Sequence, residues 1–337
     1  MGLAEMIGPL ALTMGEPAGI GGEIALKAWL RRGEGLPPFY LIDDPDRIAR
    51  LARTLGWDVP VRMIENRGRA PAVFADALPV APLGGTPVAR PGHAEPVDQA
   101  LVLRAIESAV ADVGAGRAAA LVTNPINKDA LYRAGFRHPG HTEYLAELAG
   151  SKEPAVMMLA SRELRVVPVT IHLALREAIE MLSIAAIVHA GRVVDAALRR
   201  DFAIAVPVIA VAGLNPHAGE AGGLGREDID IVAPAIAELR AAGIDARGPL
   251  AADTMFHAAA RRGYDAALCM YHDQALIPIK TIDFDSAVNV TLGLPFIRTS
   301  PDHGTAFDIA GRGEARPDSL IAALRLAAEM AHRRNKH

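Results

Sequence analysis

The stretch AALCMYHDQALIPIK, residues 266–280, joins an apolar run to three titratable side chains. The run stops at His272 and Asp273, and Lys280 follows a few residues later. A strand that ends in such residues delivers them to the edge of a sheet, where open α/β folds bind their ligands. A solvated strand end without a function would have the same sequence, so the neighbouring segments must distinguish the two interpretations.

Strands and helices alternate on both sides of this stretch, which predicts βαβ units and an α/β fold with a mostly parallel sheet. A second domain, residues 131–285, is expected to be inserted into a first domain of residues 1–130 and 286–337. Strands are expected at residues 10–14, 39–43, 59–64, 77–80, 119–122, 155–159, 164–171, 203–211 and 287–292, besides the strand that opens residues 266–280. Helices are expected at residues 97–113, 227–242, 253–263 and 318–334, among others, and a long loop at residues 292–313.

The composition limits the classes of function. The chain has 337 residues, 51% of them apolar and 22% charged, and a net charge of -4, so a nucleic acid or an anionic membrane is not an expected partner. The single cysteine, Cys269, lies in an apolar run and is expected to be buried and inert, in a reducing compartment. The N-terminal sequence is unlike a signal peptide, and no apolar run is long enough to span a bilayer. We therefore expect a cytoplasmic protein.

The segment GEPAGIGGE, residues 15–23, follows the first expected strand and is rich in glycine. It resembles a phosphate-cradling loop, but its spacing fits neither the dinucleotide fingerprint nor the P-loop. A tight structural turn is the preferred interpretation.

Three histidines follow the ends of expected strands: His172, His217 and His272. If these strands are parallel, the three imidazoles gather at one edge of the sheet and could hold a catalytic metal with an open fourth position. Three unrelated polar strand ends would give the same pattern. Asp253 is either a functional carboxylate or a helix N-cap, and Lys280 and Arg298 either bind a phosphate or are solvated charges.

The loop PDHGTAFDIAG, residues 301–311, resembles the adenosine-binding loop of the isocitrate and isopropylmalate dehydrogenases. The resemblance implies that Asp308 takes the ribose hydroxyls, and its carboxylate would repel the extra phosphate of NADP, which favours NAD over NADP. The further candidates for cofactor binding are His303, Gly304, Thr305 and Asn215.

A wider set of motifs identifies the family. The strings MGEPAGIGGEIALK, LVTNPINK, GHTEYLA, LRVVPVTIHLALRE, GLNPHAGE, GPLAADTMF and MYHDQALIPIK, with the loop just described, are together similar to the 4-hydroxythreonine-4-phosphate dehydrogenases of pyridoxal phosphate biosynthesis. The resemblance covers nearly the whole chain. It implies an isocitrate/isopropylmalate-dehydrogenase-like two-domain α/β/α fold with a cleft between the domains.

The same resemblance implies the site. A divalent metal, zinc before magnesium or cobalt, would be held by His172, His217 and His272. The phosphorylated substrate would be held by His141, Thr142, Lys280, Asn289 and Arg298. The family is a homodimer with its active site at the subunit interface, so both chains would contribute to each site.

The implied reaction is the NAD(P)-dependent oxidation of 4-phosphooxy-L-threonine to 2-amino-3-oxo-4-phosphooxybutanoate, a β-keto acid that decarboxylates to 3-amino-2-oxopropyl phosphate. Asp253, Asp273 and Lys280 are the candidate proton acceptors, and the sequence does not choose among them. Glu16, Gly22 and Asn127 depart from commoner family strings. D-threonate or D-erythronate 4-phosphate is therefore an alternative substrate. A metal-dependent phosphate-ester hydrolase or lyase, or a phosphometabolite sensor, is an alternative of another class.

Overall fold

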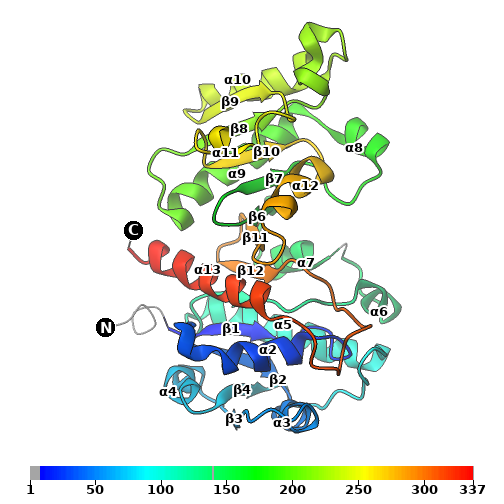
Figure 1. Ribbon diagram of the computed structural model, residues 1–337, viewed down its shortest axis with the longest axis vertical. Coiled ribbons are helices and arrows are strands. Elements are labelled where there is room, and N and C mark those ends of the chain that lie inside the picture. The colour runs from blue at the N-terminus through cyan, green and yellow to red at the C-terminus, as the bar shows by residue number, and fades with distance from the viewer. Residues whose placement is uncertain (1–7, 139, 337) are drawn as a thin grey trace. The chain divides into compact units, whose positions relative to one another are not determined.

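The computed structural model describes residues 8–138 and 140–336, and it divides into two compact units (Figure 1). Unit 1 consists of the described residues of Met1–Pro154 and Leu294–Lys336, and unit 2 is Ala155–Gly293. The prediction that the N-terminal sequence is not a signal peptide concerns, in part, residues 1–7, which lie outside the described residues.

Unit 1 contains a parallel sheet with the strand order β3-β4-β2-β1-β5-β12. Its strands are β1 (Leu10–Thr13), β2 (Phe39–Asp43), β3 (Val61–Met63), β4 (Leu78–Pro82), β5 (Leu121–Val122) and β12 (Arg298–Pro301). Its helices are α2 (Gly21–Leu30), α3 (Pro45–Thr54), α4 (Ala70–Phe74), α5 (Gln99–Gly114), α6 (Lys128–Arg133), α7 (His141–Leu148) and α13 (Asp318–Arg334), with 3-10 turns at Arg32–Glu34, Arg67–Arg69 and Pro96–Asp98.

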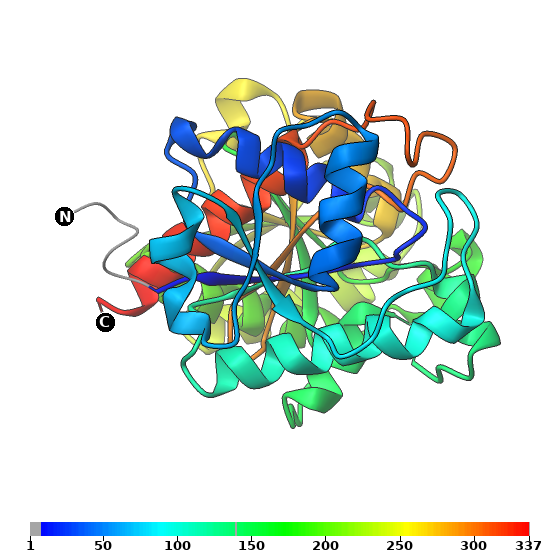
Figure 2. The same ribbon diagram turned by 90° about the horizontal axis from the view of Figure 1, so that it is seen from below.

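The central strands of unit 1 are buried because helices cover both faces of the sheet. Every residue of β1 and β2 is buried. Helices α2 and α13 lie on one face and α5 on the other (Figure 2). Strands buried on both faces are continuous apolar runs rather than alternating ones, which is why β1 and β2 are readily predicted from the sequence.

Unit 2 contains a mixed sheet with the order β11-β6-β7-β10-β8-β9. Its strands are β6 (Val156–Ala160), β7 (Arg165–Pro168), β8 (Val208–Ala212), β9 (Asp245–Leu250), β10 (Ala266–Cys269) and β11 (Val288–Leu292). Its helices are α8 (Leu175–Met181), α9 (Ile184–Phe202), α10 (Ala233–Ala241), α11 (Ala258–Arg261) and α12 (His272–Ile282), with a π-helix at Asp228–Val232 and a 3-10 segment at Pro216–Gly222.

Strands β7, β10, β8 and β9 are parallel, whereas β6 pairs antiparallel with both β7 and β11. Strands β6 and β7 thus form a hairpin, and the predicted mostly parallel α/β fold is confirmed. Cys269 is fully buried in the core of unit 2, together with Leu159, Val166 and Ile279. Burial raises the pKa of its thiol, so the predicted inert thiol agrees with its surroundings.

The unit boundaries differ from the predicted domain boundaries. Residues 131–154 were expected in the inserted domain but belong to unit 1, because α7 packs on α5 and the Tyr144 hydroxyl donates a 2.7 Å hydrogen bond to Glu107. Residues 286–293 belong to unit 2 because β11 pairs along its length with β6.

The sequence prediction missed several elements, among them α4 (Ala70–Phe74) and the three that follow. The strand of residues 266–280 ends at Cys269, and His272 begins helix α12, whose interior Pro278 argues against a helix in the sequence. Strand β9, with the sequence DARGPL, lacks an apolar run and tolerates its proline because it lies at a sheet edge. Strand β12, RTSP, lies in what was expected to be a loop and is buried although it is polar.

Among residues 8–138 and 140–336, no single helix has the length and hydropathy of a membrane span. Helices α8 and α9 reach these values only as a pair, and they are bent by 88° relative to each other.

Candidate active site

The three histidines follow three neighbouring parallel strands of unit 2. Strand β10 lies between β7 and β8 and is parallel to both. His172 follows β7, His217 follows β8 and His272 follows β10. The carboxyl ends of these strands therefore meet at one edge of the sheet, as the sequence predicted, and this edge is where α/β folds bind ligands.

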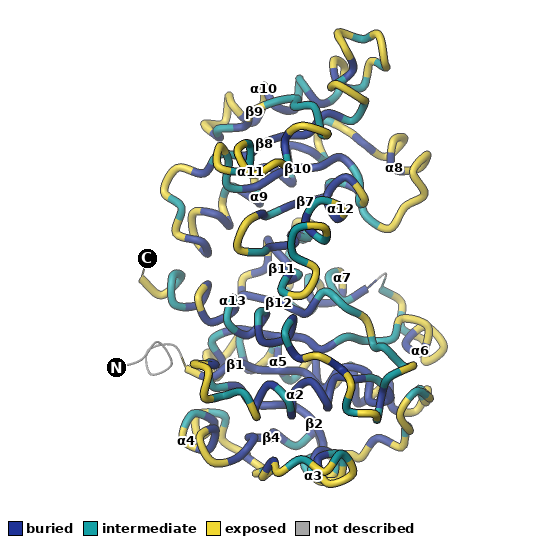
Figure 3. The backbone as a smooth tube through the Cα atoms, in the orientation of Figure 1, coloured by how far each residue is buried: buried dark blue, intermediate teal, exposed yellow. Residues whose placement is uncertain are grey.

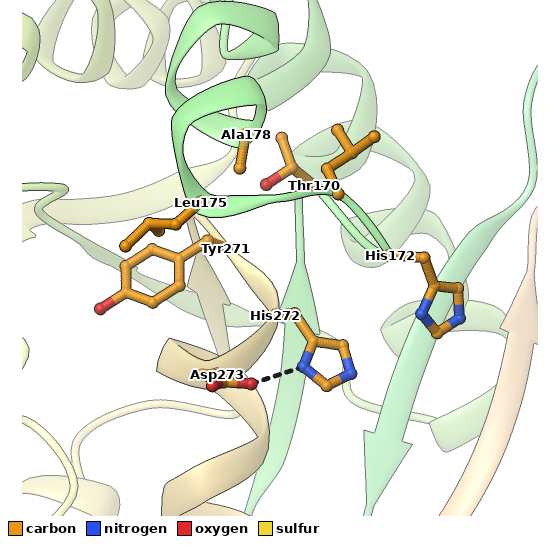
Figure 4. A pocket seen from close by; sticks show the side chains of 8 residues that line it. Thr170, His172, Leu175, Ala178, Tyr271, His272 and Asp273 are labelled. Atoms are coloured by element: carbon orange, nitrogen blue, oxygen red, sulfur yellow. Dashed lines mark hydrogen bonds and ion pairs between the residues drawn. The ribbon is translucent and has the colours of Figure 1, made fainter.

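Two of these histidines face each other in a pocket of about 360 Å³ (Figure 4). The ring centres of His172 and His272 are 5.7 Å apart, with an angle of 41° between the ring planes. Two imidazoles bound to one tetrahedral zinc, with bonds of about 2.0–2.1 Å, would hold their ring centres roughly 5 Å apart. The pair therefore fits a shared metal ion. The remaining pocket residues are Thr170, Leu173, Leu175, Ala178, Tyr271 and Asp273.

Asp273 orients the ring of His272. Its Oδ1 lies 2.7 Å from Nδ1 of His272 (Figure 4). A carboxylate at this distance favours the tautomer with a proton on Nδ1, which leaves Nε2 as the atom for a metal. Both residues lie in the first turn of α12, so the strand-to-helix turn after β10 fixes them together.

His217 lies in a different local environment. It is in the segment Pro216–Gly222, where its backbone is left-handed with a φ of 51°. Within the described part of the chain, no three His, Cys, Asp or Glu side chains are arranged to hold a metal ion. The structure thus brings together His172 and His272, and the role of His217 stays a prediction.

The other acid–base candidates differ in their position relative to this pocket. Asp253 is exposed in a turn, and the predicted helix N-cap at Asp253 is wrong: α11 begins at Ala258 and is capped by the side chain of His257. The observed helix, Ala258–Arg261, is shorter than the predicted helix of residues 253–263, because residues 253–256 form turns. Lys280 is in the last turn of α12, with its Nζ 5.8 Å from the centre of the Phe284 ring.

Arg298 is a buried cation in unit 1. It begins β12 and is only 4% exposed. Its Nε and Nη2 donate hydrogen bonds of 3.2 and 2.7 Å to Oγ1 of Thr123, at the end of β5. Burial lowers the pKa of the guanidinium to about 10, so Arg298 remains charged at neutral pH. A buried guanidinium is suited to binding a phosphate or a carboxylate.

His141 lies beside this cation. It begins α7, and its Nδ1 is 3.4 Å from Nη2 of Arg298. Its Nε2 is buried and has no hydrogen-bond partner among the residues that the structure describes. Burial, and then the charges of Arg298 and Lys128, lower the pKa of His141 well below its usual value, so the ring is neutral. Two predicted substrate residues are thus adjacent.

The remaining substrate candidates are divided between the two units. Thr142 follows His141 in the first turn of α7 and is partly exposed. Asn289 lies on β11 of unit 2, opposite Leu159, and is partly buried. Lys280 also belongs to unit 2. Their joint role in substrate binding stays a prediction.

The loop of residues 301–311 packs on the glycine-rich turn of residues 15–22. The backbone N–H of Ile20 donates a 3.1 Å hydrogen bond to the carbonyl of Thr305. A Cβ at Gly19 would lie 2.8 Å from that same carbonyl, so only glycine allows this approach. Gly15 has a φ of 70°, and a Cβ there would lie 2.7 Å from Asn124. These contacts support the preferred interpretation of the glycines as a structural turn.

The base of this loop is held by helix α2. The carboxylate of Glu23, 1% exposed, accepts the backbone N–H groups of Gly311 and, at 2.9 Å, Gly313. One turn later, Nζ of Lys27 donates 2.7 Å hydrogen bonds to the carbonyls of Gly313 and Ala315. The sequence prediction did not assign a role to Glu23 or Lys27. The sequence feature that could have pointed to them is their place in the helix that directly follows the glycine-rich turn.

The predicted cofactor residues are divided between the two units: His303, Gly304, Thr305 and Asp308 belong to unit 1, and Asn215 belongs to unit 2. Asp308 and Gly304 are exposed, and Nδ1 of His303 lies 3.1 Å from the Gly304 carbonyl. Phe307, next to Asp308, lines a cavity of about 330 Å³ in unit 1. Asn215 is instead in unit 2, where its side chain donates hydrogen bonds to Glu227 and Asp228.

The fold and these side chains at the ends of parallel strands define a dehydrogenase-like α/β enzyme. A solved structure of 4-hydroxythreonine-4-phosphate dehydrogenase from Klebsiella pneumoniae is similar, with a TM-score of 0.86 and 39% identity, covering 96% of this chain and 99% of that one. A terephthalate 1,2-cis-dihydrodiol dehydrogenase from Burkholderia xenovorans is similar with a TM-score of 0.64 and 30% identity, covering 95% and 97%.

The sequence comparisons define the family. The family model described as pyridoxal phosphate biosynthetic protein PdxA matches residues 36–327. A 4-hydroxythreonine-4-phosphate dehydrogenase from Bradyrhizobium diazoefficiens is 59% identical over 335 residues, which cover 96% of this chain and 97% of that protein. The chain belongs to this family. The resemblance identified from the motifs is confirmed, as is the prediction that the protein is an oxidoreductase.

Proposed function

We propose that the protein catalyses the NAD(P)- and divalent-metal-dependent oxidation of 4-phosphooxy-L-threonine to 2-amino-3-oxo-4-phosphooxybutanoate, which decarboxylates to 3-amino-2-oxopropyl phosphate, in the biosynthesis of pyridoxal 5'-phosphate. The observation that carries this proposal is the 59% identity, over 96% of the chain, to an enzyme named 4-hydroxythreonine-4-phosphate dehydrogenase. The paired histidines of unit 2 and the buried arginine of unit 1 support it, because such a substrate presents a hydroxyl and a phosphate.

The residues that would hold the metal are His172, His217 and His272, and zinc suits three imidazoles better than magnesium, with cobalt as an alternative. When bound, a divalent metal supplies a Lewis acid that favours the loss of a proton from a substrate hydroxyl. Asp273 holds His272 in the tautomer that ligation requires. It also lines the pocket with both histidines, so it is the first candidate for proton acceptor, before Asp253 and Lys280.

The residues that would hold the substrate phosphate are Arg298 and His141, with Thr142, Lys280 and Asn289. Arg298 contributes a fixed positive charge, because Thr123 holds its guanidinium by two hydrogen bonds. Because Nδ1 of His141 faces a guanidinium N–H of Arg298, the buried Nε2 of the neutral ring carries the proton and can donate it to an anion. An anion bound here would be shielded from water, which strengthens its hydrogen bonds.

A homodimer with the active site at the subunit interface forms part of this proposal. Leu175, Met181, Ile277 and Phe284, on and after the helices that carry the pocket, are between 59% and 72% exposed. Figure 3 shows the same exposure along α8. We infer that a partner subunit covers these exposed apolar side chains. Sedimentation of the protein as a 35.5 kDa monomer at micromolar concentration would contradict the dimer.

We also propose a cytoplasmic location. Its support is the single, buried cysteine, which needs no oxidising compartment. Recovery of the protein in a periplasmic fraction would contradict it.

Asp308 is the proposed ribose ligand and the reason for preferring NAD over NADP. When a nicotinamide cofactor is bound, it accepts the hydride. We expect Asp308→Ala to raise the KM for NAD about tenfold, because a hydrogen bond to a charged group is worth about 1.5 kcal/mol or more. The ratio of kcat/KM for NAD to kcat/KM for NADP should also decrease, since the carboxylate no longer repels the 2'-phosphate of NADP. Steady-state kinetics with each cofactor measure both effects.

The control is Glu314→Ala, which removes an exposed carboxylate just beyond the loop. It should leave both cofactor KM values unchanged, and the substrate KM should not move in either variant. An Asp308→Ala enzyme with the wild-type KM for NAD would refute the assignment of this loop.

A substrate panel tests the proposed function itself. The purified protein with zinc, magnesium or cobalt is given 4-phosphooxy-L-threonine, D-threonate 4-phosphate or D-erythronate 4-phosphate, and NADH or NADPH formation is followed at 340 nm. We expect the highest kcat/KM with 4-phosphooxy-L-threonine. A higher value with either sugar-acid phosphate would reassign the substrate. Phosphate release without cofactor reduction would favour a hydrolase, and binding without turnover would favour a sensor.

A further inference from the structure

The backbone at His217 has an unusual conformation. Five consecutive residues, His217 to Ala221, have positive φ values of 51°, 52°, 82°, 42° and 54°. Four of the five are not glycine, and L-residues in this region place Cβ too close to the backbone. Such a run persists only where the surrounding structure holds it, and strained backbone of this kind clusters at functional sites.

The group that holds this turn is the carboxylate of Asp228, which is 1% exposed. Its Oδ1 accepts the backbone N–H of Leu214 at 2.7 Å. Its Oδ2 accepts both the backbone N–H and the side-chain Nδ2–H of Asn215, each at 3.0 Å. All three donors belong to the two residues before Pro216 and His217, so the carboxylate fixes the chain where it enters the left-handed turn.

The turn also wraps closely around this carboxylate. A Cβ at Gly213 would lie 2.9 Å from Oδ1 of Asp228, and one at Gly219 would lie 3.2 Å from Oδ2. A Cβ at Gly213 would clash with the carboxylate, whereas a Cβ at Gly219, where φ is 82°, would press against it. Asp228 itself begins the π-helix Asp228–Val232, a rare element that is frequently found at functional sites.

We propose that Asp228 is a positioning residue for His217. It holds the backbone at the entry to the left-handed turn that carries His217, and so restricts the positions from which this imidazole can reach a metal. This inference rests on the proposed metal site. The carboxylate acts through the backbone of residues 214 and 215, so its loss should weaken metal binding.

The test is the metal affinity of Asp228→Asn, measured by calorimetric titration of the full-length apoprotein with Zn²⁺ and by the visible absorption spectrum with Co²⁺. Asparagine keeps the size of the side chain but turns an amide N–H₂ toward groups that are themselves donors. We expect a ten- to hundredfold weaker affinity, the range measured for residues that orient metal ligands. The Co²⁺ spectrum should change in intensity, which a merely structural substitution would not cause.

The matched control is Asp230→Asn, two residues away. Asp230 is exposed and pairs with Arg226, so its removal should change the metal affinity less than twofold. A folded Asp228→Asn protein with wild-type Zn²⁺ affinity and Co²⁺ spectrum would overturn the inference. If that variant does not fold, Gly219→Ala decides, because it presses a methyl group against the same carboxylate. If Gly219→Ala then binds Zn²⁺ with the wild-type affinity, the positioning role of Asp228 is excluded.

A third variant separates this inference from the proposed metal site. If His217→Ala binds Zn²⁺ as the wild type does, His217 is not a ligand and the metal assignment fails. If His217→Ala loses affinity but Asp228→Asn keeps it, only the positioning role fails.

Discussion

Alanine in place of His272 is expected to lower kcat at least about a thousandfold while the protein stays folded. The same is expected of His172→Ala and His217→Ala, because a site of three imidazoles that loses one no longer holds its metal in catalytic geometry. The exposed position of His172 and the partly exposed position of His272 predict little change in stability. The measurements are NADH formation, metal content by mass spectrometry and the thermal unfolding midpoint.

Two controls make this result specific. His257→Asn removes another histidine of unit 2 but keeps a side chain that can cap α11, so activity and metal content should be unchanged. A chelator should inactivate the wild-type enzyme, and Zn²⁺ or Co²⁺ should restore it. Full activity in a metal-stripped His217→Ala protein would exclude the metal role of this histidine.

The sequence predicts most of the alternating strands and helices because their signals are local. Continuous apolar runs identify β1, β2 and β10, and Asp44 with Pro45 marks the start of α3, where the Asp44 side chain does accept a hydrogen bond from the backbone N–H of Asp46. The gathering of His172 and His272 follows from the same pattern, since parallel neighbouring strands end at one edge.

The missed features depend on contacts that are distant in sequence. Strand β12 is polar, yet it is buried because it pairs with β5 and because Oγ1 of Thr299 donates a 2.9 Å hydrogen bond to the carbonyl of Ala323 in α13. The left-handed turn at His217 likewise has no local signal, because the carboxylate that holds it comes from Asp228. Residues that support a site are thus harder to predict than the residues that form it.

The order of the strands also decides which candidates can act together. Asp253 begins a helix in the prediction, but in the structure it lies in an exposed turn, whereas Asp273 is fixed beside His272. The sequence treats the two carboxylates as equal because both follow apolar segments. Asp273 lies beside His272 because β10 ends at Cys269 and α12 begins at His272.

Replacing Arg298 by methionine is expected to raise the KM for the phosphorylated substrate about a hundredfold and to leave the KM for NAD unchanged. The guanidinium is the buried charge beside His141, and a charge-assisted hydrogen bond is worth up to about 3 kcal/mol. Arg298→Lys should recover only part of the loss, because lysine keeps the charge but cannot donate through two parallel N–H groups. Arg325→Met, an exposed arginine of α13, is the control and should not change either KM.

The pH dependence gives a second, independent measure of the same group. Because the pKa of Arg298 is lowered to about 10, its charge is complete at pH 7–8 and is lost as the pH rises through 10. The substrate KM of the wild type should therefore increase above about pH 9, whereas that of Arg298→Met should already be high and lack this increase. His141, whose pKa is far below its usual value, contributes no change between pH 6 and 8. An Arg298→Met enzyme with the wild-type substrate KM would exclude Arg298 from phosphate binding.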